Sequence, residues 1–186
     1  MDDDKKLVQK TLDGEKRAFE MIVRRYQKPL FNYIQRMVGN RELALDLTQD
    51  IFVKIYSSLD SYRFQYKFRT WMFKIASNSL IDYFRKKRID TFSYEQKEKR
   101  DSPSTFQIPD DEDSVVKTFE LSNLRKRIEQ ALEKIPPQMR ELFVWRHINE
   151  FSYKEIAEIK EMPVGTIKNK VFQAKEMLRR LLEGLI

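Results

Sequence analysis

The sequence predicts an all-α protein made of two small helical domains that a flexible acidic linker joins. Apolar residues recur every three to four positions near both ends of the chain, as they do along one face of a helix. The middle of the chain lacks this period and is rich in Ser, Pro and Asp. No stretch reads as a strand with a partner. The expected boundaries are 1–90 for the first domain, 91–118 for the linker and 119–186 for the second domain.

Four helices are expected in the first domain. The first, 15–27, follows Gly14, and Pro29 suits the first turn of the second, which we expect to end at Gly39. The third, 42–59, carries apolar residues at a spacing of four from Leu43 to Ile55, and the fourth spans 68–87. The stretch YRFQYKF before it alternates like a strand, but without a partner strand we expect a loop.

Eight aromatic residues lie between Tyr62 and Arg88, interleaved with Lys and Arg and followed by the run RKKR. Aromatic faces with nearby cations are typical of proteins that bind single-stranded nucleic acid. The same residues also suit a helical core, because Phe68, Trp71 and Ile75 have helix spacing, and the basic run also suits a solvated helix end. The pattern alone leaves both interpretations open.

Charge is unevenly distributed along the chain. The formal net charge is +7 and the pI is about 9.4, which suits a polyanionic partner. Residues 1–89 hold 19 basic and 11 acidic side chains, whereas residues 90–123 hold 4 basic and 9 acidic ones. The linker, at about 25 residues, is longer than ordinary loops and is therefore expected to be functional or disordered.

The C-terminal segment predicts a helix-turn-helix. Ser152 and Glu155 form a capping-box pattern, and Pro163 separates that helix from the next. An apolar stripe from Ile167 to Leu181 leaves a basic and amide-bearing face outward, which suits contact with a DNA major groove. An antiparallel helix pair with a solvated basic face is the alternative. The outward residues are Lys168, Asn169, Phe172, Gln173 and Lys175.

Several classes of site are not expected. The chain has no cysteine, which excludes disulfides and thiolate metal sites, and its one histidine, His147, lies in an expected helix and is interpreted as a packing or surface residue. We therefore expect no cofactor, no metal and no enzymatic activity. Neither a secretory signal nor an apolar run of about 18 residues is found, so a cytoplasmic protein without membrane insertion is expected.

Three segments in order resemble the bacterial sigma factors of the extracytoplasmic-function type, which are group 4 of the sigma-70 family. They are DLTQDIFVKIY (46–56), FRTWMFKIASNSLIDYFRKKR (68–88) and, after the polar linker, LEKIPP to EMLR (132–179). The resemblance implies a non-enzymatic subunit that binds core RNA polymerase and directs promoter recognition and opening for a stress or envelope-response regulon. The implied partners are the clamp helices of the largest polymerase subunit, the flap region, promoter DNA and an anti-sigma factor. The alternative is a helix-turn-helix regulator that is not a polymerase subunit.

The resemblance also implies roles for individual residues. Those facing the polymerase are Leu45, Asp46, Gln49 and Asp50. Those binding the −10 element are Asn78, which helps form a pocket for a flipped base, Ser79 beside it, and the basic residues Arg85, Lys86, Lys87 and Arg88. Those binding the −35 element are Thr166, Lys168, Asn169, Lys170, Phe172, Gln173 and Lys175. Many relatives have glycine at Glu161 and arginine at Lys170 or Gln173, so the resemblance does not define the −35 sequence that this chain reads.

Overall fold

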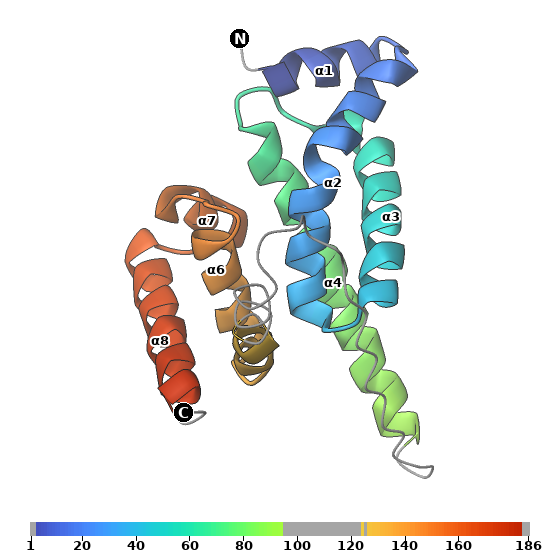
Figure 1. Ribbon diagram of the computed structural model, residues 1–186. Coiled ribbons are helices and arrows are strands. Elements are labelled where there is room, and N and C mark those ends of the chain that lie inside the picture. Colours follow the sequence, from blue (N-terminus) through green and yellow to red (C-terminus); the bar gives the residue numbers. More distant parts are fainter. Residues whose placement is uncertain (1–2, 95–123, 125, 184–186) are drawn as a thin grey trace, which may run out of the picture. The chain divides into compact units, whose positions relative to one another are not determined.

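The computed structural model describes residues 3–94, 124 and 126–183, and within this part of the chain every regular element is a helix. The chain divides into two compact units, of which the first contains α1, most of α2, α3 and α4, and the second contains α6, α7 and α8 (Figure 1). The all-α prediction is confirmed. Most of the predicted linker, 95–118, lies outside the described residues.

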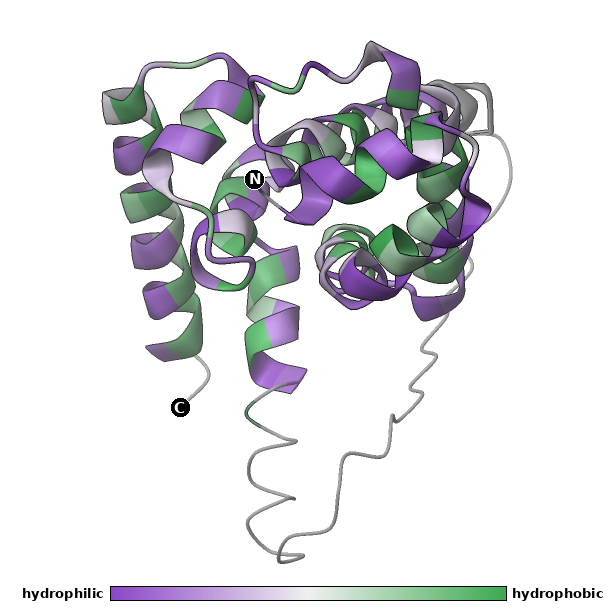
Figure 2. Ribbon diagram, turned by 90° about the horizontal axis from the view of Figure 1, so that it is seen from above, coloured by the Kyte–Doolittle hydropathy of each residue, from purple (hydrophilic) through white to green (hydrophobic). Residues whose placement is uncertain are grey.

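The first unit contains α1 (Asp3–Leu12), α2 (Lys16–Val38), α3 (Arg41–Ser57), the short 3-10 helix η1 (Leu59–Ser61) and α4 (Phe68–Tyr94). Each α-helix buries an apolar face, and the best buried side chains include Ile22, Ile51 and Phe68. Figure 2 shows the same division of green and purple faces along the ribbons. The segment before α4 is a loop, as predicted.

Helix α1 was not predicted, and two predicted boundaries differ from the structure by more than two residues. Residues 15–38 were expected to form two helices separated at Pro29, but α2 is continuous and Pro29 lies inside it. Tyr26, Leu30, Tyr33 and Ile34 are buried on either side of the proline, so tertiary packing outweighs the lost backbone donor. The second difference is that α4 continues to Tyr94, beyond the expected start of the linker at 91.

A buried carboxylate joins α1 to α2. Asp4, in the first turn of α1, accepts hydrogen bonds from the Tyr26 hydroxyl and the Arg25 guanidinium. Burial, followed by the hydrogen bond to Asp4, raises the pKa of the Tyr26 hydroxyl far above its usual value. Tyr26 therefore stays protonated and able to donate at every physiological pH.

The second unit contains a helical stretch at 126–133, α6 (Pro137–His147), α7 (Tyr153–Lys160) and α8 (Val164–Glu183). Ala131, Leu132 and Ile135 pack with Ala174 and Leu178 of α8 in one buried cluster. Arg140 of α6 donates hydrogen bonds to the carbonyl oxygens of Glu133 and Ile135, at 2.6 and 3.2 Å. These bonds join the end of the 126–133 stretch to α6.

Candidate nucleic-acid interface

The turn between α7 and α8 is specified by local sequence. The Ser152 hydroxyl accepts from the Glu155 N–H at 3.2 Å, and the Glu155 carboxylate accepts from the Ser152 N–H at 2.8 Å, which confirms the predicted capping box. At the other end of α7, Glu161 has φ 53° and ψ 42°, in the left-handed region that favours glycine. Glutamate at this position is therefore a strained choice that the turn tolerates.

Helix α8 divides into a buried and an exposed face, as its periodicity predicts. Ile167, Val171 and Ala174 are buried. The opposite face exposes Phe172 to 61% and joins Asn169 to Gln173, whose Nε2 donates to the Asn169 Oδ1 at 3.4 Å. These two amides lie one helical turn apart and present donors and acceptors side by side. Of the other predicted residues, Lys168 and Lys175 are exposed, and Thr166 and Lys170 are half-buried.

Two cations lie against the ring of Tyr153 in the first turn of α7, and sequence reasoning identified Lys168 but neither Arg146 nor Tyr153. The Tyr153 ring has the Arg146 guanidinium carbon 4.8 Å and the Lys168 Nζ 5.9 Å from its centroid. Arg146 also donates to the carbonyl of Phe151 at 3.1 Å, which fixes it near the start of α7. Arg146 and Lys168 lie on different helices, so periodicity within one helix could not have connected them. The one signal in the sequence was Tyr153, an aromatic residue directly after the helix cap Ser152, where cations can gather.

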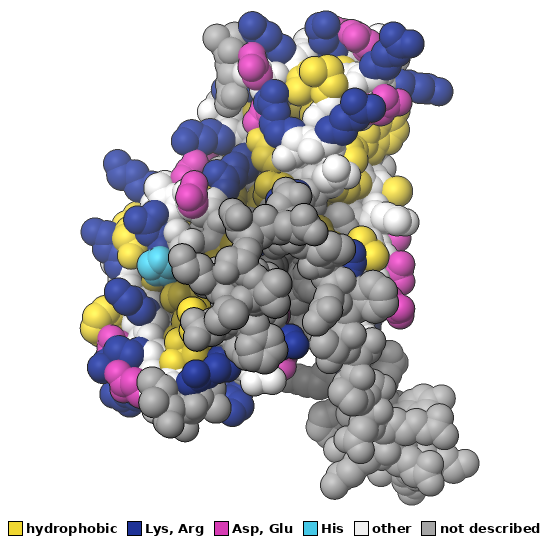
Figure 3. Space-filling model, viewed as in Figure 1, with side chains coloured by type: hydrophobic (Ala, Val, Ile, Leu, Met, Phe, Trp, Pro, Cys, Tyr) yellow, Lys and Arg dark blue, Asp and Glu magenta, His cyan; other side chains and the backbone are white. Residues whose placement is uncertain are grey.

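His147 belongs to the same part of the unit. Its ring lies 4.6 Å from the Phe143 ring, and its pKa is lowered from the ordinary histidine value, first by burial and then by Arg146 and Lys175. Figure 3 shows Lys and Arg side chains gathered along the visible face of this unit. This positive environment suits a phosphate backbone.

Buried contacts hold α7 against α6. Lys160, at the end of α7, forms an ion pair with the buried Glu141 of α6, and its Nζ lies 4.9 Å from the centroid of the buried Trp145 ring. A buried carboxylate needs such a partner, because an unpaired charge in the core is strongly destabilising. The pair therefore holds the end of α7 against α6.

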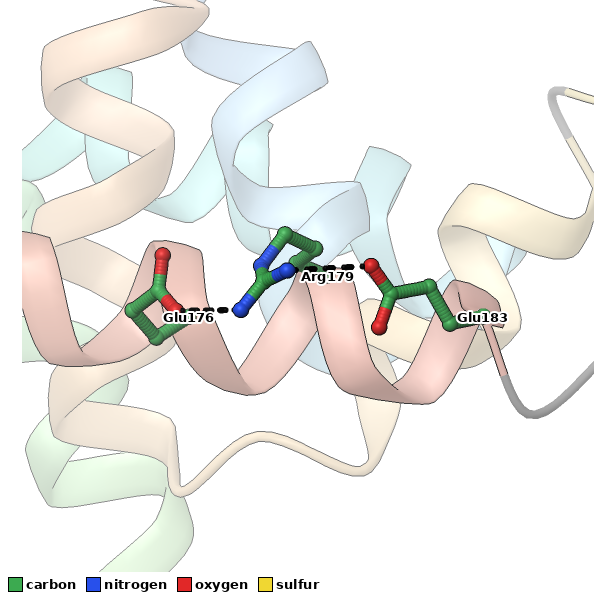
Figure 4. A network of polar contacts seen from close by, with 3 residues as sticks. All are labelled: Glu176, Arg179 and Glu183. Carbon is green, nitrogen blue, oxygen red and sulfur yellow. Dashed lines mark hydrogen bonds and ion pairs between the residues drawn. The ribbon is translucent and has the colours of Figure 1, made fainter.

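The second half of α8 carries its own surface network. Arg179 lies between two carboxylates, with N···O distances of 2.9 Å to Glu176 and 3.1 Å to Glu183 (Figure 4). Pairs at this spacing support a helix only weakly where water screens them. They offset the charge of Arg179, whereas Lys168, Lys175 and Arg180 stay exposed on the same helix.

In the first unit, the predicted polymerase-facing residues share one exposed stripe of α3. Leu45 is 43% exposed, and Asp46, Gln49 and Asp50 are exposed beside it. Val53 continues the stripe by one turn and is 67% exposed, which the sequence analysis did not anticipate. An acidic and amide-bearing stripe with apolar residues at both ends suits docking to another protein surface.

The predicted −10 residues of α4 do not all lie on one face. Asn78 is exposed, whereas the adjacent Ser79 is buried and its Oγ accepts a hydrogen bond from the Lys54 Nζ of α3 at 3.1 Å. Arg85 is exposed and pairs with Asp82 at 2.9 Å. Lys86 and Lys87 are exposed, and the side chain of Arg88 lies outside the described residues.

The aromatic residues before and within α4 mostly form core. Tyr62, Phe68 and Phe73 are buried, and the Tyr62 ring contacts the rings of Phe68 and Trp71 at centroid distances of 5.5 and 5.4 Å. Trp71 and Ile75 are half-buried, and Tyr66 remains 44% exposed. The stacking interpretation is therefore wrong for the buried rings.

The described ranges 3–94, 124 and 126–183 contain neither a metal-binding cluster nor a membrane-spanning helix. No group of three His, Asp or Glu side chains there could hold a metal ion. None of the helices in these ranges combines the length and the apolar character that crossing a bilayer requires.

Comparison with known proteins matches the two units to two family models. Sigma-70 region 2 matches residues 22–89, and sigma-70 region 4 matches residues 125–178. The chain is 36% identical to the ECF RNA polymerase sigma factor SigW of Bacillus subtilis, over 97% of each chain. It is 29% identical to the ECF RNA polymerase sigma-E factor of Escherichia coli strain K12, over 98% of this chain and 96% of the relative.

Solved structures agree with this fold. The sigma factor RpoE of Bartonella quintana, solved with the anti-sigma factor NepR, superposes with a TM-score of 0.73 at 22% identity, covering 89% of this chain and 96% of that one. CnrH, solved with the cytosolic domain of CnrY, gives 0.72 at 23% identity, covering 98% of this chain and 99% of that one. The chain belongs to the extracytoplasmic-function sigma factors, non-enzymatic subunits that bind core RNA polymerase and direct it to promoters.

Proposed function

We propose that the two units divide the work of a sigma factor. The first, residues 1–90, binds core polymerase and opens the −10 element, the segment 91–118 connects the units, and residues 119–186 read the −35 element as duplex. The observation that carries the proposal is that the first unit has two different exposed surfaces. The stripe on α3 is acidic and amide-bearing, whereas the exposed face of α4 combines Asn78 with a basic end.

The α3 stripe is the surface for the polymerase clamp helices. Leu45, Asp46, Gln49 and Asp50 give it an apolar edge and two carboxylates, a composition that repels a phosphate backbone. The flap region of the polymerase is assigned to the second unit. Neither of these polymerase contacts uses a residue assigned to DNA. Mutations can therefore separate polymerase binding from DNA binding.

On α4, Asn78 contributes to the pocket that accepts a base flipped from the −10 element. Its amide can donate and accept hydrogen bonds with the exposed edge of a base. Arg85, Lys86, Lys87 and Arg88 hold the backbone next to it. Removing a base from its stack costs a few kcal/mol, and contacts in the pocket must offset that cost.

On α8, the paired amides Asn169 and Gln173 address base edges in the −35 element. Both side chains suit adenine, because an amide can pair with the N6 and N7 edge of that base. Lys168 and Lys175 hold phosphates, and Arg146 and Tyr153 extend this backbone contact to the start of α7. Thr166, Lys170 and Phe172 complete the surface.

The cellular setting follows from the same family. CnrH and RpoE were solved with partners, RpoE with an anti-sigma factor. We assign an anti-sigma factor to this chain as well, and cytoplasmic localisation beside the polymerase.

The proposed division of labour is tested with two variants. Asp50→Lys should lower affinity for core polymerase, because it reverses a charge on the α3 stripe. Asn78→Ala should leave core affinity unchanged and lower the rate of promoter opening, followed with a fluorescent base in the −10 element. Asp13→Lys, at an exposed position with no assigned partner protein, is the matched control for charge reversal. Equal losses of core affinity in Asp50→Lys and Asn78→Ala would contradict the division.

A further inference from the structure

The contact between Lys54 and Ser79 assigns a role to a residue for which the family resemblance implied none. We propose that Lys54 binds a backbone phosphate of the opened −10 strand and that Ser79 is its positioning residue. The inference rests on the proposed −10 function of α4. It replaces the predicted contact of Ser79 with DNA by an indirect one.

The charge of Lys54 is not neutralised within the described part of the chain. Its Nζ donates to the Ser79 Oγ at 3.1 Å, and it forms no ion pair with the carboxylates of residues 3–94, 124 and 126–183. An ammonium group has three donors, and this hydrogen bond uses one of them. Two donors and a full positive charge therefore remain available at an exposed position.

The hydrogen bond to Ser79 contributes more to placement than to stability. Fixing a lysine side chain in one rotamer costs conformational entropy comparable with the gain from one hydrogen bond to a neutral hydroxyl. Ser79, in contrast, is buried and does not move freely. The Ser79 hydroxyl thus keeps the ammonium group of the otherwise flexible Lys54 side chain at one place beside α4.

That place is adjacent to the site proposed for the flipped base. Ser79 directly follows Asn78, and Lys86 lies seven residues farther on, which is two turns or about 10.5 Å along the same side of the helix. Lys54 and Lys86 therefore line one edge of α4, next to the face that exposes Asn78 and Ile81. Because each nucleotide carries one phosphate, a strand that lies along this edge while its base enters the Asn78 site brings phosphates to Lys54 and Lys86.

The test measures how salt affects binding of the strand. The holoenzyme, assembled from core polymerase and the full chain, is titrated with a fluorescent single-stranded oligonucleotide that carries the −10 sequence of a promoter it transcribes. Because a single-strand phosphate contact contributes about 0.7 to the slope of log K against log salt, Lys54→Met should reduce that slope by about 0.7. Its loss of affinity should be greatest at low salt. The control is Lys28→Met, which removes the same charge from an exposed position of α2. It should change neither the salt slope nor the affinity for the oligonucleotide.

Two further variants separate charge from structure. Lys54→Arg should restore the slope, and Ser79→Ala should weaken binding while the slope stays at its original value. If Lys54→Arg restores thermal stability but not the slope, Lys54 acts only in packing and the inference is overturned. If Lys54→Met leaves the slope unchanged while Asn78→Ala still weakens binding, the inference about Lys54 is wrong and the proposed −10 function of α4 is retained. If neither Lys54→Met nor Asn78→Ala changes binding, the inference about Lys54 and the proposed −10 function of α4 are both wrong.

Discussion

Gly165 is a residue that the fold does not require to be glycine. It lies in the first turn of α8 without a positive φ, and a Cβ added there would meet no atom within 4 Å. Glycine inside a helix costs about 0.5 to 1 kcal/mol relative to alanine. A close approach of the DNA backbone to the start of α8 would account for this cost, since helix N-termini bind phosphate.

We therefore expect Gly165→Ala to stabilise the protein and weaken its binding to DNA. The free energy of unfolding should rise by about 0.4 to 1 kcal/mol, because alanine restricts the unfolded chain. Affinity of the holoenzyme for a −35 duplex should fall, because the methyl group separates the helix from the backbone. Thermal denaturation and fluorescence anisotropy measure the two effects. Gly14→Ala, at φ 94°, should instead destabilise the protein without affecting DNA. Unchanged DNA affinity in Gly165→Ala would exclude the close approach.

At the scale of single residues, the sequence was informative where the interaction was local. Ser152 and Glu155 are three positions apart, so their capping box could be predicted. The burial of Ser79 depends on the neighbouring helix α3, and the cluster around Tyr153 joins α6, α7 and α8. The periodic pattern of a single helix cannot predict such contacts between helices.

Helix α6 ends at His147, where pH should affect DNA binding. Burial, Arg146 and Lys175 lower the pKa of His147, so the ring is neutral above pH 7 in the free protein. A phosphate held by these cations would offset their charge and raise that pKa. DNA binding would then take up a proton, and affinity for the −35 duplex should rise as pH falls from 7.5 to 6. Stability of the free protein should change in the opposite direction, since the unfolded chain binds the proton more readily below pH 6.5.

The matched variant for this effect is His147→Gln, which keeps a polar side chain without titrating in this range. Its −35 affinity should lose most of the pH dependence seen in the original protein, measured by anisotropy at constant ionic strength. Identical pH profiles for the two proteins would place His147 away from the phosphates.

At the scale of elements, the periodic pattern predicted α3, α7 and α8 well, because each has a distinct apolar face and local end signals. Pro29 misled the prediction for α2, since a proline that breaks an isolated helix is accepted where both flanks pack into a core. The end of α4 could not be predicted either. Its last residues continue a helix into a polar stretch without an apolar stripe.

The molecule as a whole is two helical units of different chemistry, and this was largely predictable. Composition shifts, the order of motifs and the resemblance to sigma factors together indicated the all-α class and the family. The roles proposed for Lys54, and for Ser79 acting through Lys54, required the structure. Their placement depends on how helices pack rather than on sequence spacing.

The most direct test of the central claim, that the second unit reads bases in the −35 element while the first opens the −10 element, is selection from a promoter library. Core polymerase with the original chain or with Gln173→Ala transcribes templates randomised at both elements, and the transcripts are sequenced. Losing one base-reading amide should cost about 1 to 3 kcal/mol on the preferred −35 sequence and relax the preference at one base pair, with the −10 preference unchanged. Lys175→Met, a control for backbone contact, should weaken all −35 sequences alike. If Gln173→Ala instead lowers transcription uniformly and leaves every base preference intact, Gln173 reads no base and the assignment of the α8 surface is wrong.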